Sequence, residues 1–267
     1  MTSETRVPGA PHPYHLVRPS PWPLVGALSG GVMAWGAVQY MHEGSWILLL
    51  IGTLAVLAVM IVWWRDVIYE AVVEKAYSQI TELGLRFGMG LFILSEVMFF
   101  AAFFWAYFNA ALFPPEAISF SWPPPTIETI DAFQLPLLMT LVLLLSGCTV
   151  TWAHHAILDD ARADTVLALM LTVLLGVVFT GIQIFEYTHA PFGFSDTVYA
   201  SVFYMATGFH GFHVLIGTTF LAVCWARARK GHFTPKGHFG FEAAAWYWHF
   251  VDVVWLFLFL CVYVWGA

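Results

Sequence analysis

Seven long apolar runs follow one another along the chain, separated by short polar segments. They cover residues 22–41, 46–64, 87–113, 134–155, 165–185, 197–225 and 242–265. A helix needs ~20 apolar residues to cross the ~30 Å hydrocarbon core of a bilayer. Backbone groups in lipid must bond within their own segment, and the alternating pattern of barrel strands is absent. The pattern therefore predicts an all-α polytopic membrane protein with seven transmembrane helices.

The positively charged residues occupy alternate gaps between these runs. They are Arg6 and Arg18 before the first run; Arg65, Lys75 and Arg86 between the second and third; Arg162 between the fourth and fifth; and Arg227, Arg229, Lys230 and Lys236 between the sixth and seventh. Cytoplasmic loops of membrane proteins collect Lys and Arg. We therefore expect the N-terminus inside and the C-terminus outside.

The spans take up most of the chain's length and leave no room for a separate soluble domain, and the composition agrees. Hydrophobic residues make up 60% of the chain and charged residues only 10%, against roughly 25% charged in soluble domains. We expect one transmembrane domain, residues 22–267, preceded by a cytoplasmic arm, residues 1–21. The arm is rich in proline and lacks an apolar core, so we do not interpret it as a signal peptide.

Glu96 is a carboxylate inside the third apolar run. Ionisable groups within the membrane are costly and point to function. A desolvated carboxyl favours its neutral form, so Glu96 could relay protons. The alternative is a neutral acid that hydrogen-bonds to another helix and fixes packing. The residues alone leave both interpretations open.

Polar side chains recur at a spacing of three in the last two runs. His210 and His213 share one helix face, and His249 and Asp252 share another. Two imidazoles and a carboxylate are able to bind a metal. Hydrogen bonding between helices is the commoner role of such residues, so we expect no metal, no cofactor and no catalytic centre in this chain.

Aromatic and basic residues are adjacent at the inner ends of two runs. Trp63 and Trp64 precede Arg65 after the second run, and Trp225 precedes Arg227 after the sixth. Aromatic belts with Arg suit anionic headgroups, either as general anchors or as specific lipid sites.

Two classes of membrane protein are excluded, and two stay open. A retinal protein needs a Lys in the last run, and residues 242–265 contain none. A seven-helix receptor has its N-terminus outside. A small proton-coupled transporter that uses Glu96 stays open, although matching broken half-helices are not evident. The other open class is a non-catalytic subunit of a larger membrane complex.

Six segments resemble subunit III of aa3-type cytochrome c oxidases, in that family's order. They include Trp63-Trp-Arg-Asp-Val-Ile68 and Ala206-Thr-Gly-Phe-His-Gly-Phe-His213. The others are residues 14–24, 92–100, 149–155 and 240–255. Related quinol oxidase subunits are shorter by two spans, so the extra spans favour the type that oxidises cytochrome c.

The resemblance implies a subunit without redox centres in a complex that passes electrons from cytochrome c to oxygen and pumps protons. Haem a, haem a3 and copper would lie in partner subunits, with subunit I as the main contact and subunit II as a second. The family's third subunit stabilises the catalytic subunit, supports proton uptake and holds phospholipids in a cleft between helices 1–2 and helices 3–7. No nucleic acid is expected.

The resemblance also assigns roles to individual residues. The family's buried carboxylate corresponds to Glu96. Lipid-binding positions correspond to Trp64, Arg65, Tyr69, Glu70, Arg86 and Arg227, although relatives commonly have Arg where this chain has Tyr69. His12 and His15 lie in the arm expected near the proton entrance. The alanine-rich, methionine-poor composition favours a bacterial inner membrane over a mitochondrial one.

Overall fold

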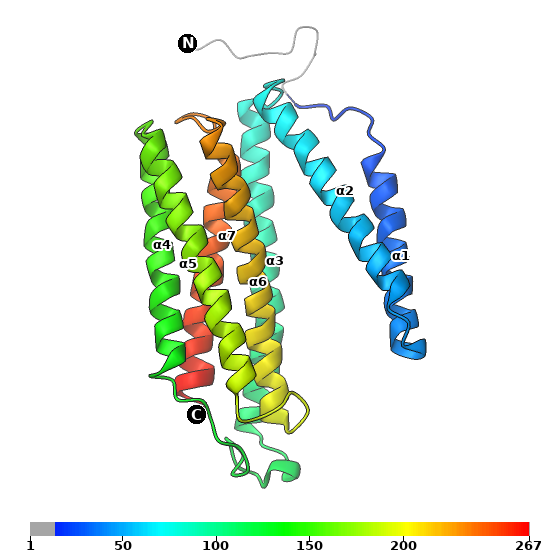
Figure 1. The fold of residues 1–267 in the computed structure, drawn as a ribbon, viewed down its shortest axis with the longest axis vertical. Coiled ribbons are helices and arrows are strands. Elements are labelled where there is room, and N and C mark those ends of the chain that lie inside the picture. Colours follow the sequence, from blue (N-terminus) through cyan, green and yellow to red (C-terminus); the bar gives the residue numbers. More distant parts are fainter. Residues whose placement is uncertain (1–13, 267) are drawn as a thin grey trace. The chain divides into compact units, whose positions relative to one another are not determined.

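The computed structural model describes residues 14–266, and this part of the chain forms seven long helices and no strand (Figure 1). The helices are α1 (Trp22–Glu43), α2 (Ile47–Val72), α3 (Gln79–Leu112), α4 (Leu135–Leu158), α5 (Arg162–His189), α6 (Val198–Arg229) and α7 (Phe239–Leu258). A short 3-10 turn, η1 (Glu116–Ile118), lies in the loop before α4, and a π-helical turn, η2 (Phe259–Val264), continues α7. The predicted all-α class is confirmed.

Six of the described helices, α2 to α7, are long and apolar enough to cross a membrane. The protein is therefore a multi-pass membrane protein. The remaining long helix, α1, is less apolar, because it contains four glycines and a polar last turn that ends at Glu43. Its 22 residues give a length of ~33 Å, enough to span a bilayer. That α1 spans the membrane, and the orientation of the termini, stay predictions.

Helices α2 and α3 extend well beyond their apolar runs. α2 ends at Val72 rather than at residue 64, and α3 begins at Gln79 rather than at residue 87. Hydropathy marks the stretch that suits lipid, whereas a helix continues for as long as its backbone hydrogen bonds do. Each extension adds about two helical turns outside the apolar run.

The chain divides into two compact units, one up to Leu85 and the other from Arg86 onward. In the first unit, α1 and α2 pack through two glycines. A Cβ atom at Gly36 would collide with the backbone of Leu48 and Leu49, and one at Gly52 would collide with Met33. Small residues allow membrane helices to approach closely. These two glycines thus define the α1–α2 contact.

The second unit is a bundle whose core contains large aromatic side chains. Trp248 and Trp255 of α7 are fully buried. Their indole N–H groups donate to Ser146 Oγ and Thr140 Oγ1 of α4, each at 2.9 Å. Donors buried in an apolar core need such partners. The hydroxyls of α4 therefore fix how α7 packs in the bundle.

Three polar contacts connect α3 to the rest of the second unit. Arg86 binds Glu242, Glu96 binds His213, and the Tyr107 hydroxyl donates to the carbonyl oxygen of Cys261 at 3.0 Å. These α3 residues are ten or eleven positions apart, which corresponds to ~15 Å along a helix. The contacts therefore anchor α3 at three levels, and two of them contain predicted site residues.

Candidate functional site

Glu96 and His213 form a direct pair between α3 and α6. Nε2 of His213 lies 2.8 Å from Oε2 of Glu96, and the two side chains are 8% and 21% exposed. Nδ1 of His213 lies 2.6 Å from the carbonyl oxygen of Phe209. A carbonyl can only accept, so Nδ1 carries a proton. One further proton then lies between Nε2 and the carboxyl, on either partner.

This geometry is compatible with a neutral acid that donates to imidazole and with an imidazolium–carboxylate ion pair. In both states the contact links α3 to α6. The packing role of Glu96 is supported by a hydrogen-bonding partner on another helix, His213. The protonation state of Glu96 stays a prediction.

The other three intramembrane polar residues do not converge with His213. His210 is fully buried and donates from Nε2 to the carbonyl oxygen of Val251 at 3.1 Å. His249 lies 3.3 Å from the Thr151 hydroxyl of α4. Asp252 is buried, and Gly147 leaves room for its Oδ2 atom, since a Cβ there would approach that oxygen to 3.0 Å. Among the described residues, these polar groups form separate contacts between helices.

Arg86 makes a two-pronged ion pair with Glu242 at the N-terminal end of α7. Its Nε atom lies 2.8 Å from Oε2 and its Nη2 atom lies 3.1 Å from Oε1. Arg–carboxylate pairs of this geometry are among the stronger hydrogen-bonded contacts. A phosphate at Arg86 would therefore share the guanidinium with Glu242.

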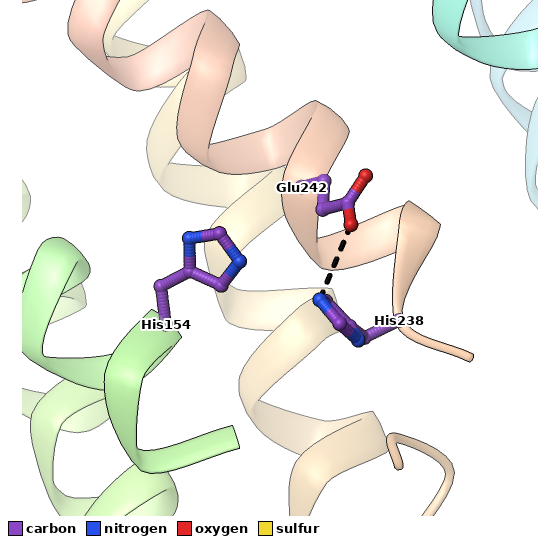
Figure 2. Close-up of side chains that lie close together, drawn as sticks. All are labelled: His154, His238 and Glu242. Carbon is purple, nitrogen blue, oxygen red and sulfur yellow. Dashed lines mark ion pairs between the residues drawn. The ribbon is translucent and has the colours of Figure 1, made fainter. Parts of the chain in front are cut away.

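Two histidines lie beside this ion pair (Figure 2). Nε2 of His238 is 3.2 Å from Oε1 of Glu242. His154, near the C-terminal end of α4, completes a group whose ligand atoms all lie within 4.8 Å of one another. It is the only such three-residue group of potential metal ligands in the described part of the chain. This group was not predicted from the sequence, although the spacing of four between His238 and Glu242 places two potential ligands close together if the helix includes both.

Arg227 lies in the same half of the second unit, near the end of α6. Its guanidinium lies over the Phe233 ring, 4.6 Å from the centroid, and its Nη1 atom occupies the space that a Cβ atom at Gly240 would need. Burial, and then the charges of Arg227 and Lys230, lower the pKa of the nearby His232. That loop histidine therefore stays neutral at neutral pH, and the positive charge there comes from Arg and Lys.

The remaining predicted lipid positions belong to the first unit. Trp64, Arg65 and Tyr69 are exposed. Glu70 is 3.6 Å from Nε2 of His15, and both residues line a cavity of about 960 Å³ between the arm and the end of α2. His12 lies outside the described residues.

Comparison with known proteins identifies the family. A family model described as cytochrome c oxidase subunit III matches residues 12–267. The chain is 53% identical over 257 residues to cytochrome c oxidase subunit 3 of Branchiostoma lanceolatum, covering 96% of this chain and 98% of the relative. It is 56% identical over 258 residues to that of Marchantia polymorpha and 55% identical over 258 residues to that of Arabidopsis thaliana, covering 96% of this chain and 97% of each relative.

The chain belongs to the cytochrome c oxidase subunit III family. This confirms the family inferred from the six sequence segments. In this subunit III chain, the contacts of Glu96, Arg86 and the polar residues of α6 and α7 are all within the second unit. The relatives named above come from an animal, a liverwort and a flowering plant. They give no support to the bacterial membrane that the composition favoured.

Proposed function

We propose that this chain is the non-redox third subunit of a proton-pumping, aa3-type cytochrome c oxidase. The observation that supports this most strongly is the family match over residues 12–267, together with relatives of 53–56% identity that cover 96% of the chain. A subunit III acts within a complex. Subunits I and II are the proposed partners, and cytochrome c is the proposed electron donor of that complex.

Haem a, haem a3 and copper would be held by the partner subunits. The two histidines of α6 do not fit them: His210 is fully buried and in ring contact with Phe179 and Trp255, at centroid distances of 5.8 and 5.0 Å. His213 uses its two nitrogens for Phe209 and Glu96. A haem ligand needs a free nitrogen that faces an open pocket. Nδ1 of His210 is unpaired but enclosed in the core, and both nitrogens of His213 are engaged, so we assign no electron-transfer step to this chain.

The proposed contributions of the chain are stabilisation of the catalytic subunit, support of proton uptake and binding of phospholipid. Exposed Trp64, Arg65 and Tyr69 at the end of α2 suit headgroup contact, because aromatic and guanidinium groups favour the interface. On α3 and α6, Arg86 and Arg227 would add charge for phosphate oxygens. The arm with His12 and His15 is proposed to lie near the proton entrance.

Affinity purification of the tagged chain from its native membrane tests this proposal. We expect two larger membrane subunits to copurify, one with haem a absorption, in a preparation that oxidises cytochrome c. A chain that purifies alone, and that moves protons when reconstituted in vesicles, would instead favour the transporter that uses Glu96.

A further inference from the structure

The cluster of His154, His238 and Glu242 joins two segments that are far apart in the sequence. His154 comes from the last turns of α4, His238 directly precedes α7, and Glu242 lies one turn further along α7. Figure 2 shows the two imidazoles and the carboxylate facing a common space. Their nearest ligand atoms all lie within 4.8 Å of one another.

The hydrogen bonds of His238 show that one proton or cation is needed between its Nε2 atom and Glu242. Its Nδ1 atom lies 2.9 Å from the carbonyl oxygen of Thr234, so Nδ1 must carry a proton. Its Nε2 atom then faces Oε1 of Glu242 at 3.2 Å. A neutral imidazole would direct a lone pair at a carboxylate oxygen. The contact is favourable only with a proton between the two atoms, on either partner, or with a cation there.

The surroundings resemble the outer shell of a metal site. Metal-binding histidines commonly donate the N–H of their second ring nitrogen to a backbone carbonyl, which fixes the ring. Nδ1–H of His238 donates to the carbonyl oxygen of Thr234 in this way. Arg86 orients the carboxylate of Glu242 in the same way. Among residues 14–266, no hydrogen bond engages the ring of His154, so this side chain can turn toward an ion.

We propose that His154, His238 and Glu242 bind one divalent transition-metal ion of the zinc type. Two imidazole nitrogens and one carboxylate oxygen form a common zinc ligand set, with water in the fourth position. Ca²⁺ and Mg²⁺ prefer all-oxygen sites and do not suit this one. Ligand atoms of a tetrahedral zinc site are roughly 3.3 Å apart, close to the His238–Glu242 distance. His154 has to move closer by a change of rotamer.

The position of the site limits its affinity. Arg86 and the first turn of α7 place positive charge beside it, which opposes a dication. His238 is 8% exposed and His154 is partly exposed, so an ion can enter and leave. We therefore expect reversible binding, weaker than in closed four-ligand structural sites. The expectation of a metal-free chain is argued from His210, His213 and His249, which lie outside this cluster. The present proposal replaces that expectation for the cluster alone.

Zinc titration of the purified, chelator-treated complex that contains this chain tests the inference. We compare the unaltered chain with His154→Gln and with His155→Gln, whose histidine is the exposed neighbour outside the cluster. We expect His154→Gln to weaken one zinc site by more than tenfold, because even the loss of a residue that hydrogen-bonds to a metal ligand costs about 10–100-fold in affinity. His155→Gln should leave that site unchanged.

Equal zinc binding by the unaltered chain and His154→Gln would overturn the inference, as would equal losses in both variants. Zinc-edge X-ray absorption of the unaltered complex gives an independent measurement. The zinc that is bound in the unaltered complex but lost in His154→Gln should have nitrogen and oxygen ligands. Sulfur ligands at this zinc, or oxygen ligands without nitrogen, would also overturn the inference. His238→Gln should reproduce the loss.

Discussion

Glu96 and Glu242 each face a histidine whose other ring nitrogen donates to a backbone carbonyl. In both pairs the carbonyl fixes the ring, and one proton or cation must occupy the space between Nε2 and the carboxyl. The pairs differ in their surroundings, because Glu242 also binds Arg86. We therefore interpret Glu96–His213 as a contact between two helices and Glu242 as the centre of a larger polar cluster.

Glu96→Gln is expected to retain most oxidase turnover, since the amide can donate to Nε2 of His213 as a neutral acid would. Glu96→Ala leaves that nitrogen without its partner and should cost about 1–3 kcal/mol in the free energy of unfolding. Thermal loss of this subunit from the complex measures the difference. Ser95→Ala is the control, since Ser95 bonds only within its own helix, to Phe92.

An Ala variant as stable as the Gln variant would contradict the packing role of Glu96. Loss of proton pumping in an intact Glu96→Gln complex would contradict it more strongly. A direct proton relay through α3 would then have to replace it.

Lipid binding is tested at the basic residues. Replacing Arg86 and Arg227 together by Ala should lower the amount of tightly bound phospholipid and shorten the working lifetime of the complex, because guanidinium–phosphate contacts are lost. Native mass spectrometry counts the lipids. Glu242→Gln is the control: it disrupts the ion pair of Arg86 but keeps both guanidinium groups. Unchanged lipid in the double variant would contradict the assignment.

At the scale of elements, the sequence predicted all seven helices because apolar runs dominate its pattern. It did not predict the extension of α2 to Val72 or the early start of α3 at Gln79, since these turns are too polar to mark a span. It placed His210 and His213 on one helix face. It could not show that His210 contacts α7 whereas His213 contacts α3, because pairing between helices depends on bundle geometry.

The α1–α2 contact is expected to fail when its glycines gain side chains. Gly36→Ala introduces a Cβ where the backbone of α2 lies, and overpacking of this kind costs about 1–3 kcal/mol. Gly30→Ala is the matched control, because nothing lies within 4 Å of its added Cβ and alanine gains up to about 1 kcal/mol in helix propensity. Thermal unfolding of the two variants should shift in opposite directions. Equal shifts would mean that this contact contributes little.

At the scale of the whole molecule, alternate loops should lie on opposite sides of the membrane. Two exposed positions suit single cysteine substitutions: Thr126, in the loop before α4, and Asp159, in the loop before α5. In a chain without its native cysteines, an impermeant maleimide should label Thr126→Cys from outside and Asp159→Cys only from inside. Labelling of both from one side would contradict the predicted topology.

This chain is proposed to be a subunit of an oxidase whose redox centres lie in other subunits. The most direct measurement is the haem a and copper content of the complex purified through this chain, before and after the chain is separated from its partners. We expect haem a and copper to stay entirely with the partner fraction and the separated chain to show no haem absorption. Haem or copper that stays with the separated chain, or a complex that contains neither, would contradict the proposed role of a non-redox oxidase subunit.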